Sequence, residues 1–193
     1  MNLKKLVTAA VCTMLMAAVA FTAGCGGEKK SDKKVLKVGM ECAYAPYNWS
    51  QTKADGGAVK IAGSNEYAYG YDVMMAKKLA DSMGADLEIH KIEWDGLAPA
   101  VVSGKIDAAI AGMSITSKRK ETVDFTKPYY YATVVALVKK DSEQAKAQSV
   151  ADLKGSVATS QLNTIWYDQI DQVPDVKKLP AIDTVPGMIV ALT

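Results

Sequence analysis

From residue 35 onward, apolar and polar residues follow each other along the chain in two different periods. Residues 72–83 repeat apolar positions at spacings of three and four, which predicts an amphipathic helix whose apolar face packs inward. The residues predicted on that face are Val73, Ala76, Leu79, Ala80 and Met83. Short runs of apolar and β-branched residues predict three strands, at 35–40, 87–90 and 106–111.

A second helix is predicted over 95–103, with Asp95 as the candidate N-cap, and Thr116 is predicted to cap a short basic helix. Residues 50–64 are polar, contain several glycines and show no period, so we expect an irregular segment there. The order of regular elements up to residue 111 is therefore β-α-β-α-β. This order predicts an α/β fold in which helices pack on a sheet.

A new α/β unit is predicted to begin near residue 149. The β-branched run 129–139 predicts a strand that leaves the first unit. Beyond it, the pattern predicts a short helix at 149–155, a strand at 156–159 and helices at 165–170 and 185–192. The last of these helices is apolar and reaches the end of the sequence without a C-cap or a polar tail, so we expect a truncated chain.

The first 24 residues predict a secretory signal peptide. Two lysines precede Leu6–Ala23, a stretch that has no charged residue and ends in small side chains. An uncleaved membrane helix is the alternative, because about 18 apolar residues can just span a bilayer. Thr22–Cys25 (TAGC) resembles the lipobox of bacterial lipoproteins, which implies cleavage before Cys25 and lipid modification of that cysteine. Residues 25–34 are small and charged and are then expected to form a solvated tether.

Charge and cysteine content narrow the range of partners. Removal of Lys4 and Lys5 with the signal leaves 21 basic and 21 acidic residues, a balance that does not favour nucleic acid. Cys12 is removed with the signal and Cys25 takes the lipid, so Cys42 remains alone and no disulfide framework is expected. The sequence contains no metal-binding or nucleophile motif of known spacing, and we therefore expect neither a cofactor nor a metal.

Several sequence blocks resemble those of one protein family. Gly104–Arg119 (GKIDAAIAGMSITSKR) resembles a signature of the periplasmic-binding-protein type II family, and within it of the bacterial extracellular solute-binding proteins of amino-acid ABC transporters. The other matching blocks, in the same order and spacing, are Gly70–Val73, Trp94–Ala100, Val123–Tyr129, and Asp152–Gly155 ahead of Ser160–Thr164. The resemblance covers nearly all of residues 35–193, and the joint occurrence of the blocks makes it specific.

The resemblance implies an α/β, two-lobe periplasmic-binding-protein-like fold that encloses its ligand between the lobes. Residues 35–130 would form lobe 1, residues 131–140 the outbound hinge strand, and residues 141–193 part of lobe 2. The remainder of lobe 2 and the return crossing to lobe 1 are expected to be missing, so the second lobe would be incomplete.

Arg119 is the candidate residue for binding a ligand carboxylate. A bidentate guanidinium in the first turn of the short basic helix can meet an anion together with backbone N–H groups. Gly112 permits close approach of the backbone, and Ser114 offers a hydroxyl and an N–H group. Taken alone, Arg119 stands between two lysines and fits a solvated charge run better. The resemblance, however, assigns Gly112, Met113, Ser114 and Arg119 to ligand binding.

The remaining candidates surround the same ligand. The resemblance places Tyr44 and Trp94 where two rings sandwich the ligand side chain, and Glu41 where an acid faces the pocket. Asn163 and Thr164 fall in a turn whose amides meet the carboxylate from lobe 2. Each candidate has a structural alternative. The two aromatic rings could pack in the core, Glu41 could lie at the surface, and Asn163 and Thr164 could form an ordinary turn. The main acceptor for the ligand ammonium is implied beyond the last residue.

These features predict capture of a free amino acid and its delivery to an ABC permease. The protein is expected outside the cytoplasm, anchored to the cell membrane by the lipid on Cys25, and monomeric when complete. We expect no enzymatic activity. One alternative is a ligand-binding sensor domain of a receptor, which needs a transmembrane continuation that a lipobox makes unnecessary. The other is an enzyme that reuses the fold, such as a dehydratase.

Overall fold

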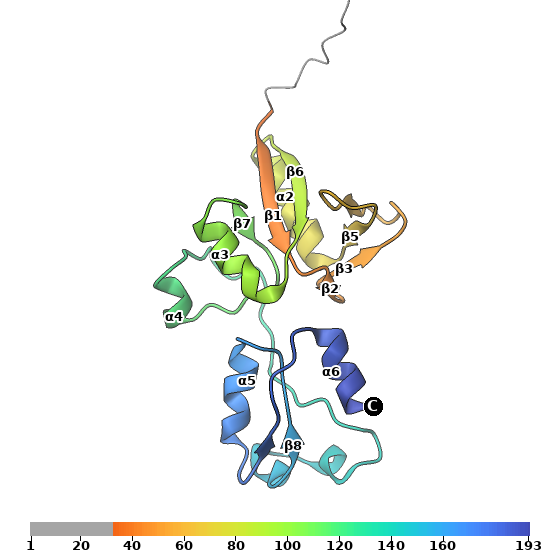
Figure 1. The fold of residues 1–193 in the computed structure, drawn as a ribbon, viewed down its shortest axis with the longest axis vertical. Coiled ribbons are helices and arrows are strands. Elements are labelled where there is room, and N and C mark those ends of the chain that lie inside the picture. The colour runs from red at the N-terminus through yellow and green to blue at the C-terminus, as the bar shows by residue number, and fades with distance from the viewer. Residues whose placement is uncertain (1–32) are drawn as a thin grey trace, which may run out of the picture. The chain divides into compact units, whose positions relative to one another are not determined.

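The computed structural model describes residues 33–193 (Figure 1). The predicted signal peptide at 1–24, the lipidation site Cys25 and most of the tether lie outside the described residues. Within residues 33–193, no helix combines the length and the apolar character needed to cross a membrane.

The regular elements are short, apart from one helix and two strands. The strands are β1 (Val35–Met40), β2 (Ala43–Tyr44), β3 (Asn48–Gln51), β4 (Val59–Lys60), β5 (Tyr67–Tyr69), β6 (Asp86–Lys91), β7 (Ala108–Ala109), β8 (Val157–Ala158) and β9 (Lys177–Lys178). The α-helices are α2 (Tyr71–Ser82), α3 (Leu97–Val102), α4 (Ser117–Lys120), α5 (Ile165–Gln169) and α6 (Val185–Leu192). The 3-10 helices are η1 (Trp94–Gly96), η2 (Glu143–Lys146), η3 (Val150–Leu153) and η4 (Ile170–Gln172).

A parallel sheet with the strand order β6-β1-β7 forms the centre of residues 35–130, here called the N-terminal region (Figure 1). Val38 of β1 pairs with Ile89 of β6 on one side and with Ala108 of β7 on the other. Val38 and Ile89 are fully buried in the hydrophobic core. The predicted β-α-β-α-β order is confirmed, because this sheet joins all three predicted strands side by side.

Helix α2 confirms the predicted amphipathic helix, shifted by one residue. Val73, Ala76 and Ala80 are buried against the core, as the period predicted. Leu79 and Met83 are exposed, so their placement on the apolar face was wrong. Leu79 follows Lys77 and Lys78 on the exposed side of the helix, and Met83 is the C-cap residue after its last turn.

The second predicted helix starts differently from the prediction. The chain first forms the 3-10 turn η1, in which the N–H of Gly96 donates to the carbonyl of Glu93 at 2.9 Å. Asp95 therefore lies inside this turn, and the N-cap of α3 is Gly96, without a side-chain cap. The prediction of Asp95 as N-cap was wrong because the extra turn moves the N-cap one residue along the chain, to Gly96.

An antiparallel sheet with the order β2-β3-β5-β4 lies within residues 43–69, and part of it falls in the segment 50–64 that was predicted to be irregular. Trp49 of β3 pairs with Tyr69 of β5, and their rings meet edge to face with centroids 5.0 Å apart. The strands have only two to four residues, which is too short to display a period of two. Their pairing depends on contacts across the sheet, and this explains why the prediction failed.

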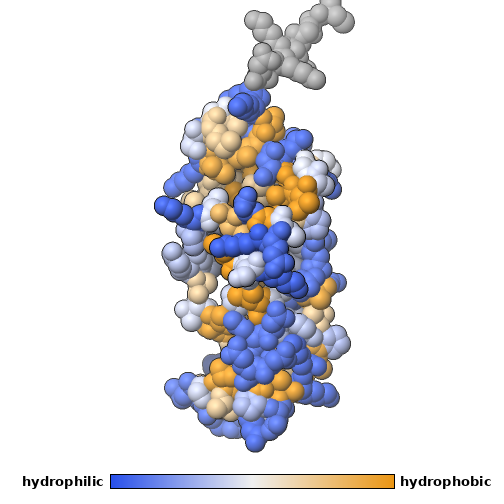
Figure 2. All heavy atoms as spheres, turned by 90° about the vertical axis from the view of Figure 1, so that its left-hand side faces the viewer, coloured by the Kyte–Doolittle hydropathy of each residue, from blue (hydrophilic) through white to orange (hydrophobic). Residues whose placement is uncertain are grey.

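The run 129–139 is not a strand, which contradicts the predicted hinge strand at 131–140. Among residues 33–193 no strand pairs with it, so its backbone N–H and C=O groups form no strand-to-strand hydrogen bonds there. Its apolar side chains reach solvent; Tyr131 is 83% exposed and Val135 is 81% exposed. Figure 2 shows that apolar residues also reach the surface in several patches on the face it displays.

The C-terminal region, residues 141–193, contains the parallel pair β8 and β9. The predicted helix at 149–155 is the 3-10 turn η3, which Ser149 and Asp152 close with a reciprocal capping box. The predicted strand at 156–159 is regular only over β8, and α5 and α6 confirm the two predicted helices. Together with the parallel sheet of the N-terminal region, these elements confirm the α/β class.

Candidate functional site

Arg119 is held by contacts on several sides. Its backbone N–H donates to Thr116 Oγ1 at 3.1 Å, which confirms Thr116 as the N-cap of α4. Its Nη1 donates to the carbonyl of Ser114 at 2.7 Å, and its Nη2 donates to the carbonyl of Asn163 at 2.9 Å. The guanidinium also lies over the Trp94 ring, with Cζ 5.4 Å from the ring centroid. These contacts fix the direction of the guanidinium.

The Arg119 guanidinium retains donors for a ligand. A guanidinium carries five N–H donors, and the two carbonyl bonds use only part of them. Burial lowers the pKa of Arg119 from its ordinary value, while the nearby Asp168 carboxylate acts in the opposite direction. Arginine stays charged despite such a change, because its ordinary pKa lies far above neutral pH. An oriented, partly desolvated guanidinium of this kind suits a carboxylate.

The loop before α4 brings Gly112 beside Tyr44. Gly112 has φ 62°, a left-handed conformation that favours glycine, and a Cβ added there would lie 3.4 Å from Tyr44 Cε1. The N–H of Gly112 donates to Tyr129 Oη at 3.0 Å. The side chain of Met113 packs on the hydrophobic core. A ligand contact at Met113 would therefore come from its backbone, and the Gly112 N–H already has a partner.

Tyr44 lies in β2 with a half-buried ring. The ring stacks on Tyr47, with centroids 4.9 Å apart and an angle of 28° between the planes. Burial raises the pKa of Tyr44, and the carboxylates of Asp72 and Glu41 add to this change. The hydroxyl therefore stays protonated in the neutral pH range, which leaves a flat apolar face with a polar tip.

Glu41 is buried directly after β1, which excludes the alternative of a surface position. Its side chain is 4% exposed, and its Oε1 accepts a hydrogen bond from Gln161 Nε2 at 2.9 Å. The same Gln161 nitrogen donates to the carbonyl of Asp183 at 2.9 Å. Burial raises the pKa of Glu41 to about 7; the bond from Gln161 opposes this change, and the charges of Glu93 and Asp95 add to it. Glu41 thus titrates near neutral pH.

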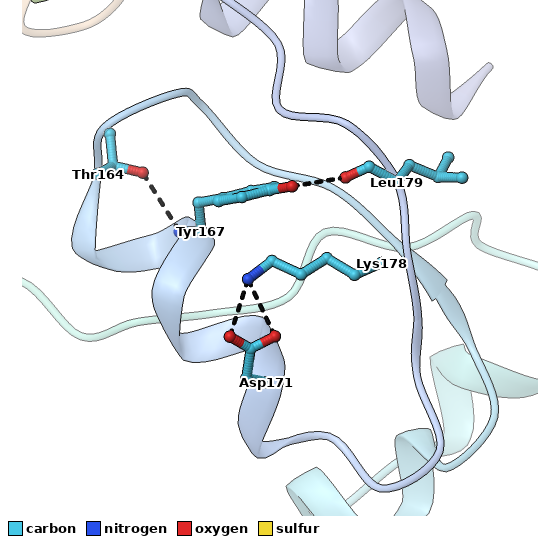
Figure 3. A network of polar contacts seen from close by, with 5 residues as sticks. All are labelled: Thr164, Tyr167, Asp171, Lys178 and Leu179. Carbon is cyan, nitrogen blue, oxygen red and sulfur yellow. Dashed lines mark hydrogen bonds and ion pairs between the residues drawn. The ribbon is translucent and has the colours of Figure 1, made fainter.

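Asn163 and Thr164 form the turn that leads into α5. Asn163 has φ 54°, a conformation that asparagine tolerates better than most residues. Thr164 Oγ1 donates to the carbonyl of Gln161 at 2.6 Å. The same oxygen accepts from the N–H of Tyr167 at 3.3 Å, a bond drawn in Figure 3. The Thr164 hydroxyl is therefore occupied as the N-cap of α5, whereas the Asn163 carbonyl meets Arg119.

Polar contacts behind this turn hold α5 and η4 to the strand β9 (Figure 3). Lys178 Nζ lies 2.9 Å from both carboxylate oxygens of Asp171 and 4.1 Å from the centroid of the Tyr167 ring. Tyr167 Oη donates to the carbonyl of Leu179 at 2.9 Å. These contacts attach α5, whose N-cap is Thr164, to the rest of the C-terminal region and thereby restrict the Asn163–Thr164 turn.

A pocket of about 200 Å³ borders the Arg119 cluster through the shared residue Trp94. Its other lining residues are Glu93, Asp95, Leu162 and Asp183, so three of its five side chains are acidic. Its volume is below the roughly 300–1,000 Å³ of sites for drug-sized ligands, which fits a small metabolite. The sequence prediction missed these acids because they come from segments about 90 residues apart and carry no motif.

The structure thus brings most of the predicted site residues close to one another. Arg119 contacts Ser114, Trp94 and Asn163 directly, and Tyr44 lies beside Gly112. Glu41 is connected to the C-terminal region through Gln161, whose role the sequence prediction missed, although Gln161 stands inside one of the quoted blocks. Among residues 33–193, no group of three or more histidine, cysteine, aspartate and glutamate side chains is arranged to hold a metal.

Comparison with known proteins identifies a family. The family model described as bacterial extracellular solute-binding proteins, family 3, matches residues 36–178. The arginine-binding extracellular protein ArtP of Bacillus subtilis (strain 168) is 33% identical over 140 residues, which are 72% of this chain and 49% of ArtP. The ABC transporter arginine-binding protein 1 of Escherichia coli (strain K12) is 32% identical over 176 residues, which are 91% of this chain and 61% of that protein.

A solved structure supports the same fold. The arginine-bound form of truncated ArgBP from T. maritima superposes with a TM-score of 0.67 at 29% sequence identity, covering 82% of this chain and 68% of that chain. The chain spans about half the length of ArtP and about three fifths of the E. coli relative. The fold is accordingly that of two-lobe amino-acid-binding proteins, of which this chain covers a part.

Proposed function

Because the chain belongs to the bacterial extracellular solute-binding proteins, family 3, we propose that the protein captures a free amino acid outside the cytoplasm and delivers it to an ABC permease. The observation that carries the proposal is the orientation of Arg119 by the carbonyls of Ser114 and Asn163. A guanidinium fixed in this way keeps three further N–H donors, and an amino-acid carboxylate can accept two of them in parallel. The relatives named above are binding proteins, which supports a binding role over an enzymatic one.

We further propose that the amino acid carries a cationic side chain. Glu93, Asp95 and Asp183 line the pocket beside Trp94, and Glu41 is buried close enough to Glu93 and Asp95 for their charges to affect its pKa. Among the described residues the pocket lining contains no basic side chain. A cationic group would neutralise this concentration of negative charge, and Trp94 adds a ring face that attracts cations. Both relatives named above are described as arginine-binding proteins, which agrees with this choice.

Calorimetric titration at two pH values tests both parts of the proposal. Glu41 is expected to be mostly ionised at pH 8 and mostly protonated at pH 6, since its pKa is about 7. If ionised Glu41 pairs with the ligand, L-arginine should bind about tenfold more tightly at pH 8 than at pH 6. L-Glutamine, which is uncharged in its side chain, should show no such change. L-Argininamide should bind far more weakly than L-arginine at both pH values, because it lacks the carboxylate.

The variant Glu41→Gln should bind L-arginine weakly at both pH values, whereas the control Glu143→Gln, at a highly exposed carboxylate, should behave like the wild type. Equal binding of L-arginine and its amide would contradict the amino-acid function. A flat pH profile for L-arginine would contradict only the pairing with Glu41.

In the ligand-free protein the raised pKa of Glu41 favours its protonated form. The free energy of unfolding should therefore fall as the pH rises from about 4.5 to about 7.

We propose that a lipid on Cys25 anchors the protein to the outer side of the cell membrane. The support is the Thr22–Cys25 sequence together with the description of the family as extracellular. Mass spectrometry of detergent-extracted protein should identify Cys25 as the first residue, carrying a lipid adduct. Replacement of Cys25 by serine should release the protein in soluble form, because a stable anchor requires the attached acyl chains. A wild-type protein that starts at another residue and carries no lipid would refute the anchor.

A further inference from the structure

A fully buried carboxylate, Asp72, lies at the start of α2 outside the predicted set of ligand contacts. It is 0% exposed, and each of its two oxygens accepts one short hydrogen bond. Asn48 Nδ2 donates to Oδ2 at 2.7 Å, and Tyr129 Oη donates to Oδ1 at 2.7 Å. Burial raises the pKa of Asp72, and the bonds from Tyr129 and Asn48 oppose this change. A buried carboxylate needs such partners, because burial of an unpaired charge costs several kcal/mol.

Both partners of Asp72 also bind the backbone of the candidate site. Asn48 Oδ1 accepts the N–H of Cys42 at 2.8 Å, directly after Glu41. Tyr129 Oη accepts the N–H of Gly112 at 3.0 Å, two residues before Ser114. One carboxylate therefore connects two of the backbone segments that carry proposed ligand contacts in the N-terminal region.

The two anchored positions share an uncommon backbone conformation. Cys42 has φ 56° and Gly112 has φ 62°, both in the left-handed region. For Cys42 this conformation is unfavourable unless neighbouring contacts hold it, since only glycine adopts it freely. The N–H groups of these two residues are the ones that donate to the network, Cys42 to Asn48 Oδ1 and Gly112 to Tyr129 Oη. The buried network thus acts on the two positions of these segments that have a left-handed backbone.

We propose that Asp72 and Tyr129 are positioning residues of the ligand site, which hold the Glu41–Tyr44 and Gly112–Ser114 segments in a binding-competent arrangement. This inference rests on the proposed function, because it assumes that these segments contact an amino acid. Tyr129 acts through Gly112, and Asp72 acts through Tyr129 and Asn48. The phenol donates its proton to Asp72 and accepts from Gly112, so both of its bonds disappear when the hydroxyl is removed.

The variant Tyr129→Phe tests the proposal because it removes one oxygen and keeps the ring. In the ligand-free protein the amide hydrogen of Gly112 should exchange at least about tenfold faster than in the wild type, while amides of β1 and β6 keep their protection. At a temperature where both proteins are folded, L-arginine should bind about tenfold more weakly, a loss of about 1.4 kcal/mol. The ratio of the affinities for L-arginine and L-argininamide should fall by a similar factor, because the Gly112–Ser114 segment is proposed to contact the ligand carboxylate.

The variant Tyr131→Phe provides the matched control. It removes a hydroxyl from the tyrosine two residues further along the chain, whose side chain is 83% exposed. Hydrogen exchange at Gly112 and the affinity for L-arginine should stay unchanged in this variant. A purely structural role would lower the midpoint of urea unfolding in Tyr129→Phe without changing affinity or the preference over the amide. Unchanged affinity, or unchanged exchange at Gly112, would overturn the positioning role. If the wild type itself bound no amino acid, this result would contradict the proposed function. The positioning role, which rests on that function, would then be contradicted as well.

Discussion

Replacement of Arg119 by alanine is expected to weaken the binding of a free amino acid by at least about 100-fold, a loss of roughly 2.7 kcal/mol. The wild-type guanidinium is held at 2.7 Å from the Ser114 carbonyl and at 2.9 Å from the Asn163 carbonyl, so it does not have to be ordered when the ligand arrives. Alanine removes the charge, the paired donors and the contact with Trp94 together. The measurement is calorimetric titration of the protein with L-arginine at pH 8.

The variant Arg119→Lys should recover only part of the lost affinity. An ammonium is a point charge with three donors and cannot bind two backbone carbonyls and a carboxylate in one plane. Lys118→Ala is the matched control, because Lys118 is the adjacent exposed cation of the same helix. If Arg119→Ala and Lys118→Ala changed the affinity equally, Arg119 would be a member of a solvated charge run and would not bind the carboxylate.

Replacement of Gly70 by alanine is expected to destabilise the fold by at least about 3 kcal/mol. Gly70 precedes α2 with φ 128° and ψ −176°, a backbone conformation that is essentially restricted to glycine. A Cβ added there would lie 2.3 Å from the carbonyl oxygen of Tyr47 and 3.0 Å from that of Pro46. These oxygens cannot move freely, because they accept the N–H groups of Asp72 and Tyr71 at 2.8 and 3.1 Å.

Gly84→Ala is the matched control for this prediction. Gly84 follows the same helix with φ 62°, and a Cβ added there meets no atom within 4 Å. The control therefore retains the cost of a left-handed residue, about 1–2 kcal/mol, without the collision. Urea unfolding of both variants gives the comparison. If both variants lost the same free energy of unfolding, the structure around Gly70 would have moved to accommodate the added Cβ. Only the backbone conformation of Gly70 would then explain the loss of stability.

The sequence by itself determined the features that depend on neighbouring residues. The period of α2 and the apolar runs of β1 and β6 lie within single segments, and the structure confirms all three. The cap at Thr116 is equally local, because its side chain accepts the N–H of Arg119 three residues along the chain. The resemblance of several blocks to one family likewise needed no coordinates, and the family match confirms it.

Only the tertiary structure decided the features that depend on distant partners. Two- and three-residue strands such as β2 and β5 exist because other strands pair with them, whereas the strongly β-forming run 129–139 finds no partner within residues 33–193 and stays irregular. Asp72 meets Tyr129 across 57 residues, and Glu41 meets Gln161 across 120. No local pattern encodes such pairs, since burial and hydrogen bonding select them when separate segments pack together. The acidic pocket and the buried network behind the site could therefore be found only in the folded chain.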